Sequence, residues 1–178
     1  FRGDLTERYR WAEGPTKMEA VLFTIDSATG KCGMCEKSVA VASTTVSGIA
    51  TYFETLGAAV TAAESCVEAD NAVVTLLADI DLGDNDQWII SGVFTLDLNG
   101  FELAGSDSSV LCIQNAETNV TITDSGEGGT ITSKNYGYAI YATSGTVTIE
   151  GGTITSRNYG VYTTSSIVNI TGGTISGD

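Results

Sequence analysis

The sequence predicts an all-β solenoid, a parallel β-helix of about four to five coils. Two features of the C-terminal half support this: GGTI and NYG segments recur, and so do β-branched triplets. The triplet Val147-Thr148-Ile149 recurs as Val168-Asn169-Ile170, 21 residues later, and Ile154 and Val161 follow Val147 by 7 and 14 residues. Each seven-residue segment can hold a short strand and a turn, with alternate side chains turned inward. Stacked coils would pair their strands and enclose an apolar core.

Earlier triplets extend the pattern toward the N-terminus. Val120-Thr121-Ile122, Phe94-Thr95-Leu96 and Val74-Thr75-Leu76 take the same place, at spacings of 27, 26 and 20 residues. The longer coils contain the insertions DSGEG and GSDSS, whose glycine, serine and aspartate favour turns. We therefore expect every triplet to lie in one sheet, in equivalent positions.

The segment TYFETLGAAVTAAES, residues 51–65, predicts a helix that covers the first coil, since an open solenoid end needs a cap. Thr51 and Glu54 have the spacing of a capping box. An apolar stripe at helical spacing would lie over the open end. Its members are Phe53, Leu56, Val60 and Ala63.

Residues 1–46 do not follow the coil pattern and predict a small β extension, distinct from the helix and solenoid of residues 47–178. Two short strands are expected about a turn at Ala28-Thr29-Gly30. Cys32 and Cys35 form a CxxC pair, half of a zinc-ribbon signature, and a local disulfide or free thiols are the favoured alternatives. A four-cysteine site would need Cys66 and Cys112 to converge on them. The chain stops inside a repeat, so we expect a C-terminally truncated piece of a longer protein.

The run YFETLGAAVTAAES, VVTLLADIDL and FTLDLNGFELAG, followed by GGTI coils, resembles the pectate-lyase-like β-helix modules of large secreted or surface-attached bacterial proteins. The resemblance implies a right-handed helix and a secreted or cell-surface location. Short CxxC segments before such coils belong to the same resemblance, as remnants of a linking module. The fold serves enzymes, adhesins and stalks alike, so it does not specify activity.

Charge and hydropathy exclude two classes of partner. Eight basic and 22 acidic residues give a net charge of −14 with no histidine, and such a chain repels nucleic acid. No apolar run approaches the roughly 18 residues of a membrane span, so we expect no membrane insertion. No cofactor motif is present. The expected partners are an extracellular polysaccharide or host glycan and neighbouring domains of the same longer chain.

Outward tyrosines are the candidate ligand-binding residues. Counting back seven from Val147 and Val168 turns Tyr141 and Tyr162 outward on neighbouring coils. Stacked aromatic rings can bind sugar rings, and they also form ordinary ladder pairs that stabilise a sheet. The NYG segments align a second tyrosine pair, and the asparagines beside it predict a turn ladder whose amides bond along the stack. These aligned residues are Tyr136, Tyr159, Asn135 and Asn158.

Acidic residues supply the other candidates. The segment ADIDLGDNDQW could hold calcium, but we favour a charged, solubilising first coil. Its carboxylates are Asp79, Asp81, Asp84 and Asp86. Asp97 and Glu150 share one column, with Thr123 between them, and could suit an inverting acid–base pair. Solvated acids on a sheet face are the favoured interpretation.

Two functions remain open. The favoured one is a non-catalytic structural or adhesive module of a bacterial surface or secreted protein that presents Thr, Tyr and Asn to a glycan. The alternative is a fragment of a polysaccharide lyase or glycoside hydrolase. Catalysis needs acids and bases that converge on one face. Lys134 and Arg157 match in the repeat but lie at a turn on another edge, so binding is favoured over catalysis and no catalytic residue is assigned.

Overall fold

The computed structural model describes residues 25–26, 31–32, 39–66, 72–83, 88–106 and 109–177. The chain forms two compact units, Phe1–Val39 and Ala40–Asp178. In the first unit, β1 (Ile25–Asp26) pairs antiparallel with β2 (Lys31–Cys32). This pairing confirms the two short strands expected about residues 28–30.

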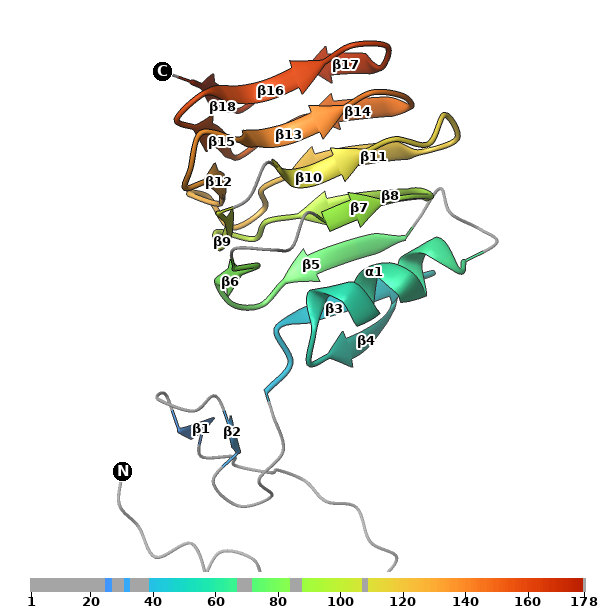
Figure 1. The fold of residues 1–178 in the computed structure, drawn as a ribbon. Helices are drawn as coiled ribbons and strands as arrows, with labels where there is room; N and C mark the ends of the chain where they lie inside the picture. Colours follow the sequence, from blue (N-terminus) through green and yellow to red (C-terminus); the bar gives the residue numbers. More distant parts are fainter. Residues whose placement is uncertain are drawn as a thin grey trace, which may run out of the picture. The chain divides into compact units, whose positions relative to one another are not determined.

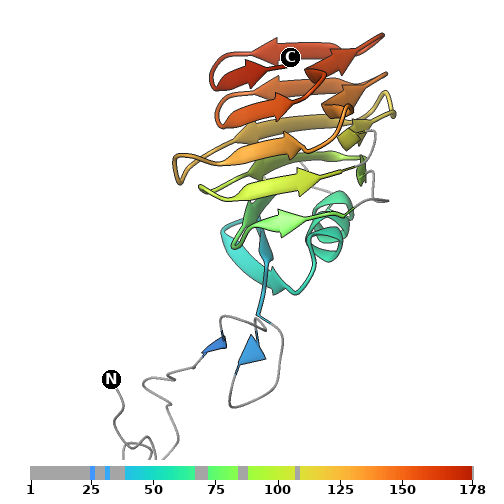
Figure 2. The same ribbon diagram turned by 60° about the vertical axis from the view of Figure 1, so that its left-hand side comes forward.

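The second unit is a parallel solenoid of about four turns, in which three strands and three turns make each coil. Figures 1 and 2 show the coils stacked one above another, with the later residues at one end of the stack. The three walls are sheets of seven, five and four strands, here named sheets I, II and III. The chain runs through sheet I, then II, then III, and enters sheet I again one coil further on.

All but two of the strands in sheet I belong to the parallel stack, and β3 and β4 extend the sheet at its N-terminal edge as an antiparallel hairpin. Its strands are β3 (Ala42–Val46), β4 (Ile49–Phe53), β5 (Val73–Leu76), β8 (Val93–Asp97), β11 (Asn119–Thr123), β14 (Thr146–Ile149) and β17 (Ile167–Ile170).

Sheets II and III are parallel throughout. Sheet II consists of β6 (Ile80–Asp81), β9 (Glu102–Gly105), β12 (Thr130–Ser133), β15 (Thr153–Ser156) and β18 (Thr174–Ser176). Sheet III consists of β7 (Trp88–Ile90), β10 (Ser109–Ile113), β13 (Tyr138–Ala142) and β16 (Tyr159–Thr163).

The repeat predicts the register of three of the four inter-triplet steps. Val120 pairs with Phe94 and Val147, and Val147 pairs with Val168. The predicted register of the first step is wrong, because Val74 pairs with Leu96 and not with Phe94. β5 is also held antiparallel to β3, and this pairing is not contained in the triplet spacing. The shift is two residues, so side-chain alternation is preserved.

Each wall contributes an inward apolar column to one continuous core. Ile154 is fully buried and pairs with Ile131 in β12. Ile140 in β13 is fully buried and pairs with Val161 in β16. The division of the 21-residue cycle into sevens is therefore confirmed, because each seven provides one wall.

The cap differs from its predicted boundaries. The helix α1 (Leu56–Glu64) begins after Thr55, whose hydroxyl accepts a hydrogen bond from the Ala58 N–H. The predicted capping box is wrong, because Thr51 lies in β4 and faces Thr44 across the hairpin. The hairpin turn at Ser47 and Gly48 has positive φ angles of 51° and 78°, as a two-residue type I′ turn requires. The buried helix face consists of Leu56, Ala59, Val60 and Ala63.

The glycine pair of GGTI permits the sharp turn from sheet I to sheet II. Gly173 has a φ of 78°, which glycine adopts without strain. A Cβ there would also lie 2.7 Å from the Gly152 carbonyl oxygen of the coil before. Conformation and close coil-to-coil packing therefore both select glycine at position 173.

Candidate functional site

Four tyrosines gather on the outer face of sheet III, and we name them the tyrosine cluster: Tyr138, Tyr141, Tyr159 and Tyr162. Tyr141 pairs with Tyr162, and Tyr138 pairs with Tyr159, so β13 and β16 supply two rings each. Ala139 and Ile140 are both buried between the outward Tyr138 and Tyr141. The strand thus departs from strict alternation, and this departure turns two rings of one strand to the same side.

The alignment of the NYG segments selects Tyr136 where the cluster contains Tyr138. Tyr136, matched to Tyr159 by sequence, lies outside the stack and is 80% exposed, whereas Tyr138 is the true partner of Tyr159. Ser133 pairs with Ser156, so the turn before β13 is two residues longer than the turn before β16. Tyr136 lies in that longer turn. Alignment on the strands with a 21-residue spacing would have found Tyr138.

The rings overlap only partly. The Tyr141 and Tyr162 centroids lie 5.8 Å apart with the ring planes 16° from parallel. Planes in van der Waals contact are roughly 3.5–4.0 Å apart, so the rings are offset sideways by about 4 to 5 Å. Tyr138 packs more directly on Tyr162, with 4.7 Å between centroids. Offset stacking leaves part of each ring face open beside its neighbour.

The two candidate asparagines hold turns together. The Asn135 side-chain amide donates to the Ser106 carbonyl, and the Asn158 amide donates to the Tyr136 carbonyl at 3.3 Å. Each bond joins a coil to the coil before it. The predicted turn ladder is confirmed, with backbone carbonyls as the acceptors, and these amides support the turns that lead into the tyrosine strands.

The carboxylates of two central coils clamp the stack. Asp97 accepts hydrogen bonds from the Ser125 N–H and hydroxyl at 2.9 and 2.7 Å. Asp124 accepts from the Gly100 N–H and the Gly129 N–H, both at 2.7 Å. Each carboxylate therefore binds a neighbouring coil. This role accounts for the aspartate at the end of β8 and for the aspartate that follows β11.

The column that suggested an acid–base pair has the predicted order. Asp97 pairs with Thr123 in the next coil. Glu150 lies one coil further on, and its N–H donates a hydrogen bond to the Ile122 carbonyl of the coil before it. Asp97 also accepts from the Asn99 N–H, so its oxygens already hold three donors. The Asp97 carboxylate therefore stabilises the turn after β8 and its contact with the next coil.

The acidic first coil is only partly described. Asp79 accepts from the Glu102 N–H at 2.8 Å, and Asp81 accepts from the Gly83 N–H and from Lys134. Asp84 and Asp86 lie outside the described residues. Within the described ranges, no three His, Cys, Asp or Glu side chains gather in a manner that could hold a metal ion.

The cysteines are spread along the chain. Cys66, after α1, donates to the Ala62 carbonyl at 3.1 Å, and Cys112 is a buried free thiol in β10. Burial raises the pKa of Cys112 above its ordinary value, so the thiol stays protonated at neutral pH. Cys32 lies in β2, and Cys35 lies outside the described residues.

Comparison with known protein families, with curated proteins and with solved structures gives no match for this chain. No helix in the described ranges has the length and apolar content that a membrane crossing needs.

Proposed function

We propose that the solenoid is a non-catalytic structural and adhesive module whose tyrosine cluster binds polysaccharide. The observation that supports this proposal is the offset stack of four rings on one solvent-facing wall. The C–H faces of sugar rings pack on aromatic rings, and tyrosine adds a hydroxyl that can bond to sugar hydroxyls. Tyr159 is 52% exposed, so a ligand has access to the stack.

The setting of the module belongs to the same proposal. A pectate-lyase-like, right-handed helix in a secreted or surface-attached bacterial protein would place this wall in contact with extracellular or host glycans. Neighbouring domains of a longer chain would then supply attachment. The occupied hydrogen-bonding positions of Asp97 favour binding over cleavage, because a general acid or base must be available to substrate.

The test is electrophoresis of the native protein through gels with and without dissolved dextran, laminarin or xyloglucan. We expect at least one polysaccharide to retard the wild-type protein, with little dependence on salt because ring stacking is not Coulombic. Tyr141→Ala combined with Tyr162→Ala should abolish the retardation. The matching Phe substitutions should keep it, as should Tyr52→Ala, which removes an exposed tyrosine from β4.

Two results would overturn the proposal. Equal retardation of the double alanine variant would show that the cluster is not the binding surface. New reducing ends or unsaturated sugars during incubation would establish the alternative, a polysaccharide lyase or glycoside hydrolase. If no polysaccharide retards the wild-type protein, the adhesive part is wrong and a structural stalk remains.

A further inference from the structure

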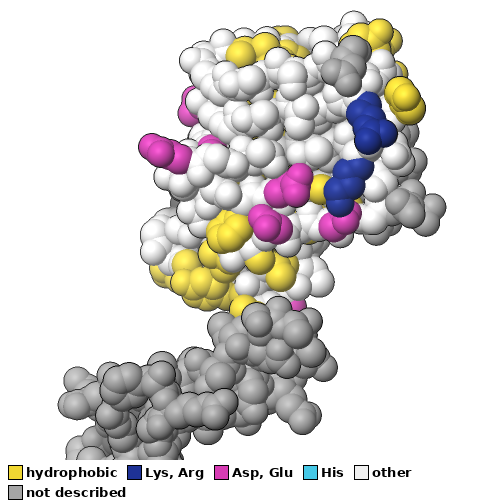
Figure 3. Space-filling view, turned by 90° about the vertical axis from the view of Figure 1, so that its left-hand side faces the viewer, with side chains coloured by type: hydrophobic (Ala, Val, Ile, Leu, Met, Phe, Trp, Pro, Cys, Tyr) yellow, Lys and Arg dark blue, Asp and Glu magenta, His cyan; other side chains and the backbone are white. Residues whose placement is uncertain are grey.

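The solenoid unit contains only two basic side chains, and they are neighbours. Residues 40–178 include two basic and 16 acidic residues, so the net charge of −14 falls entirely on this unit. Lys134 follows β12 and Arg157 follows β15, and because Ser133 pairs with Ser156 they occupy one position in consecutive coils. Figure 3 shows these two basic side chains in dark blue, one above the other on the surface that faces the viewer. Like charges repel, so this placement needs an explanation.

The two cations differ in how they are compensated. Lys134 Nζ lies 2.6 Å from Asp81 Oδ2 and forms an exposed salt bridge across the coils. Arg157 is exposed, and no ion pair or hydrogen bond joins its guanidinium to any part of the chain that the structure describes. Arg157 therefore presents an uncompensated charge on a strongly acidic unit.

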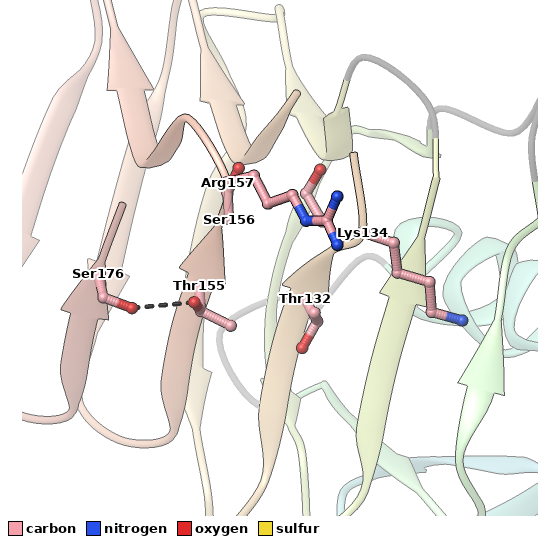
Figure 4. Close-up of a pocket in the computed structure, with 7 residues that line it drawn as sticks. Thr132, Lys134, Thr155, Ser156, Arg157 and Ser176 are labelled. Atoms are coloured by element: carbon pink, nitrogen blue, oxygen red, sulfur yellow. Dashed lines mark hydrogen bonds between the residues drawn. The ribbon is translucent and has the colours of Figure 1, made fainter. Parts of the chain in front are cut away.

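Hydroxyl groups line the surface beside Arg157. A shallow hollow on the outer face of sheet II includes Arg157, Lys134 and the outward column Thr132, Thr155 and Ser176. Figure 4 shows the Arg157 side chain extended from the end of β15 toward the end of β12. A hydrogen bond of 2.9 Å joins Thr155 and Ser176 on the other side of β15. Neighbouring strands lie about 4.8 Å apart, and each hydroxyl can both donate and accept a hydrogen bond. This surface suits the hydroxyls of a sugar.

The hollow borders the tyrosine cluster. Arg157 precedes Tyr159 by two residues, so their Cα atoms are separated by no more than about 7 Å. One glycan chain could therefore place neutral rings on the tyrosines and a substituent at the turn between sheets II and III.

The charges of the solenoid unit indicate which substituent of the glycan this turn would bind. A guanidinium binds a carboxylate, or the similar oxygens of an ester sulfate, through two parallel hydrogen bonds. A polymer charged at every sugar would meet the repulsion of the acidic side chains on the same unit, whereas a single charge would be shielded from most of them beyond roughly 8 Å at physiological salt. We propose that Arg157 and the adjoining hydroxyls bind an isolated oxyanion of a sparsely charged polysaccharide. This inference rests on the proposed function for the neutral part of the ligand.

The test uses the gel assay with a matched series of dextrans. The series contains neutral dextran, lightly carboxymethylated and lightly sulfated dextrans with roughly one charge per ten sugars, beyond a Debye length, and dense dextran sulfate. At least one lightly charged dextran should bind the wild-type protein more tightly than neutral dextran does. Arg157→Gln should remove the difference, about tenfold for one charge-assisted hydrogen-bonded contact. Whichever light derivative binds more tightly identifies the oxyanion.

A charge-matched control separates the site from the net charge. Asn169→Asp changes the net charge by the same amount as Arg157→Gln, but on the exposed outer face of β17, so it should preserve the difference between light and neutral dextran. The proposal is overturned if Arg157→Gln keeps that difference, if no light derivative exceeds neutral dextran, or if dense dextran sulfate binds most tightly. If neutral dextran does not bind while a lightly charged dextran still binds in an Arg157-dependent manner, the tyrosine proposal fails for this polymer and the oxyanion site stands.

Discussion

The inner and outer sides of β13 and β16 follow different rules. Inside, Ile140 pairs with Val161 in a column that stays apolar from coil to coil. Outside, the column changes from the buried Cys112 to Tyr141 and Tyr162. Every coil must bury its inner side chains, so the repeat is strict there. The outer side carries no such requirement, and we locate recognition where the repetition breaks.

The largest expected effect comes from charging the inner side. Ile154→Asp places a carboxylate in a fully buried position without a partner and should cost several kcal/mol of unfolding free energy. Thr155→Asp, on the outer side of the same strand, is the matched control and should cost far less. Thermal and denaturant unfolding measure both. A variant at position 154 as stable as the wild-type protein would contradict the assignment of inner and outer sides.

Removal of a coil clamp should have an intermediate effect. Asp124→Ala leaves the Gly100 and Gly129 N–H groups without their acceptor, and we expect a loss of about 1–3 kcal/mol. Glu150→Ala, which removes an exposed carboxylate one coil later, should change the unfolding free energy by less than about 0.5 kcal/mol. Equal losses for the two variants would contradict a structural role for Asp124.

The outer tyrosines should contribute less still to stability. Tyr138→Ala removes contacts with three stacked rings and should cost about 1 kcal/mol. Tyr136→Ala removes a side chain that is 80% exposed and should change stability by less than about 0.5 kcal/mol. If the two substitutions were equal in urea unfolding, the strand register that pairs Tyr138 with Tyr159 would be wrong.

The smallest effect concerns the outer salt bridge. The Lys134 ammonium donates to Asp81 and, together with the Gly83 N–H, holds the pKa of that carboxyl below its ordinary value. Because the folded pKa is lowered, the stabilisation is present above the unfolded pKa and is lost as the pH falls through the folded one. Lys134→Gln should move the Asp81 pKa up in an NMR titration. No movement would show that the pair is not formed in solution.

The sequence predicts most of the interior and less of the surface. Burial repeats with the coil, so Val120, Val147 and Ile154 were located from spacing alone. The spacing does not predict the Ser47-Gly48 hairpin, because Phe53 stands at helical spacing from Leu56 although it lies in β4. Where the repeat is irregular, spacing alone does not fix the register.

The surface chemistry was harder to predict because it depends on turn lengths. Because consecutive turns differ in length by two residues, alignment of the NYG segments matches Tyr136 to Tyr159, whereas Tyr138 is the partner of Tyr159 in the structure. The hydrogen bonds of Asp97 and Asp124 likewise reach donors that are distant in sequence. Spacing within one strand identifies an outward side chain, but the neighbouring coil determines its partners.

The most direct test of the distinction between the two sides is a titration followed by NMR. Tyrosine ring signals and isoleucine, leucine and valine methyl signals would be recorded as the polysaccharide that retards the protein in gels is added. We predict that the rings of Tyr138, Tyr141, Tyr159 and Tyr162 shift saturably together, while the methyls of Ile140 and Ile154 stay unchanged and Tyr52 is unaffected. Saturable shifts at the inner methyls or at Tyr52, with the cluster unchanged, would contradict the assignment of stability to the inside and recognition to the outer wall of sheet III.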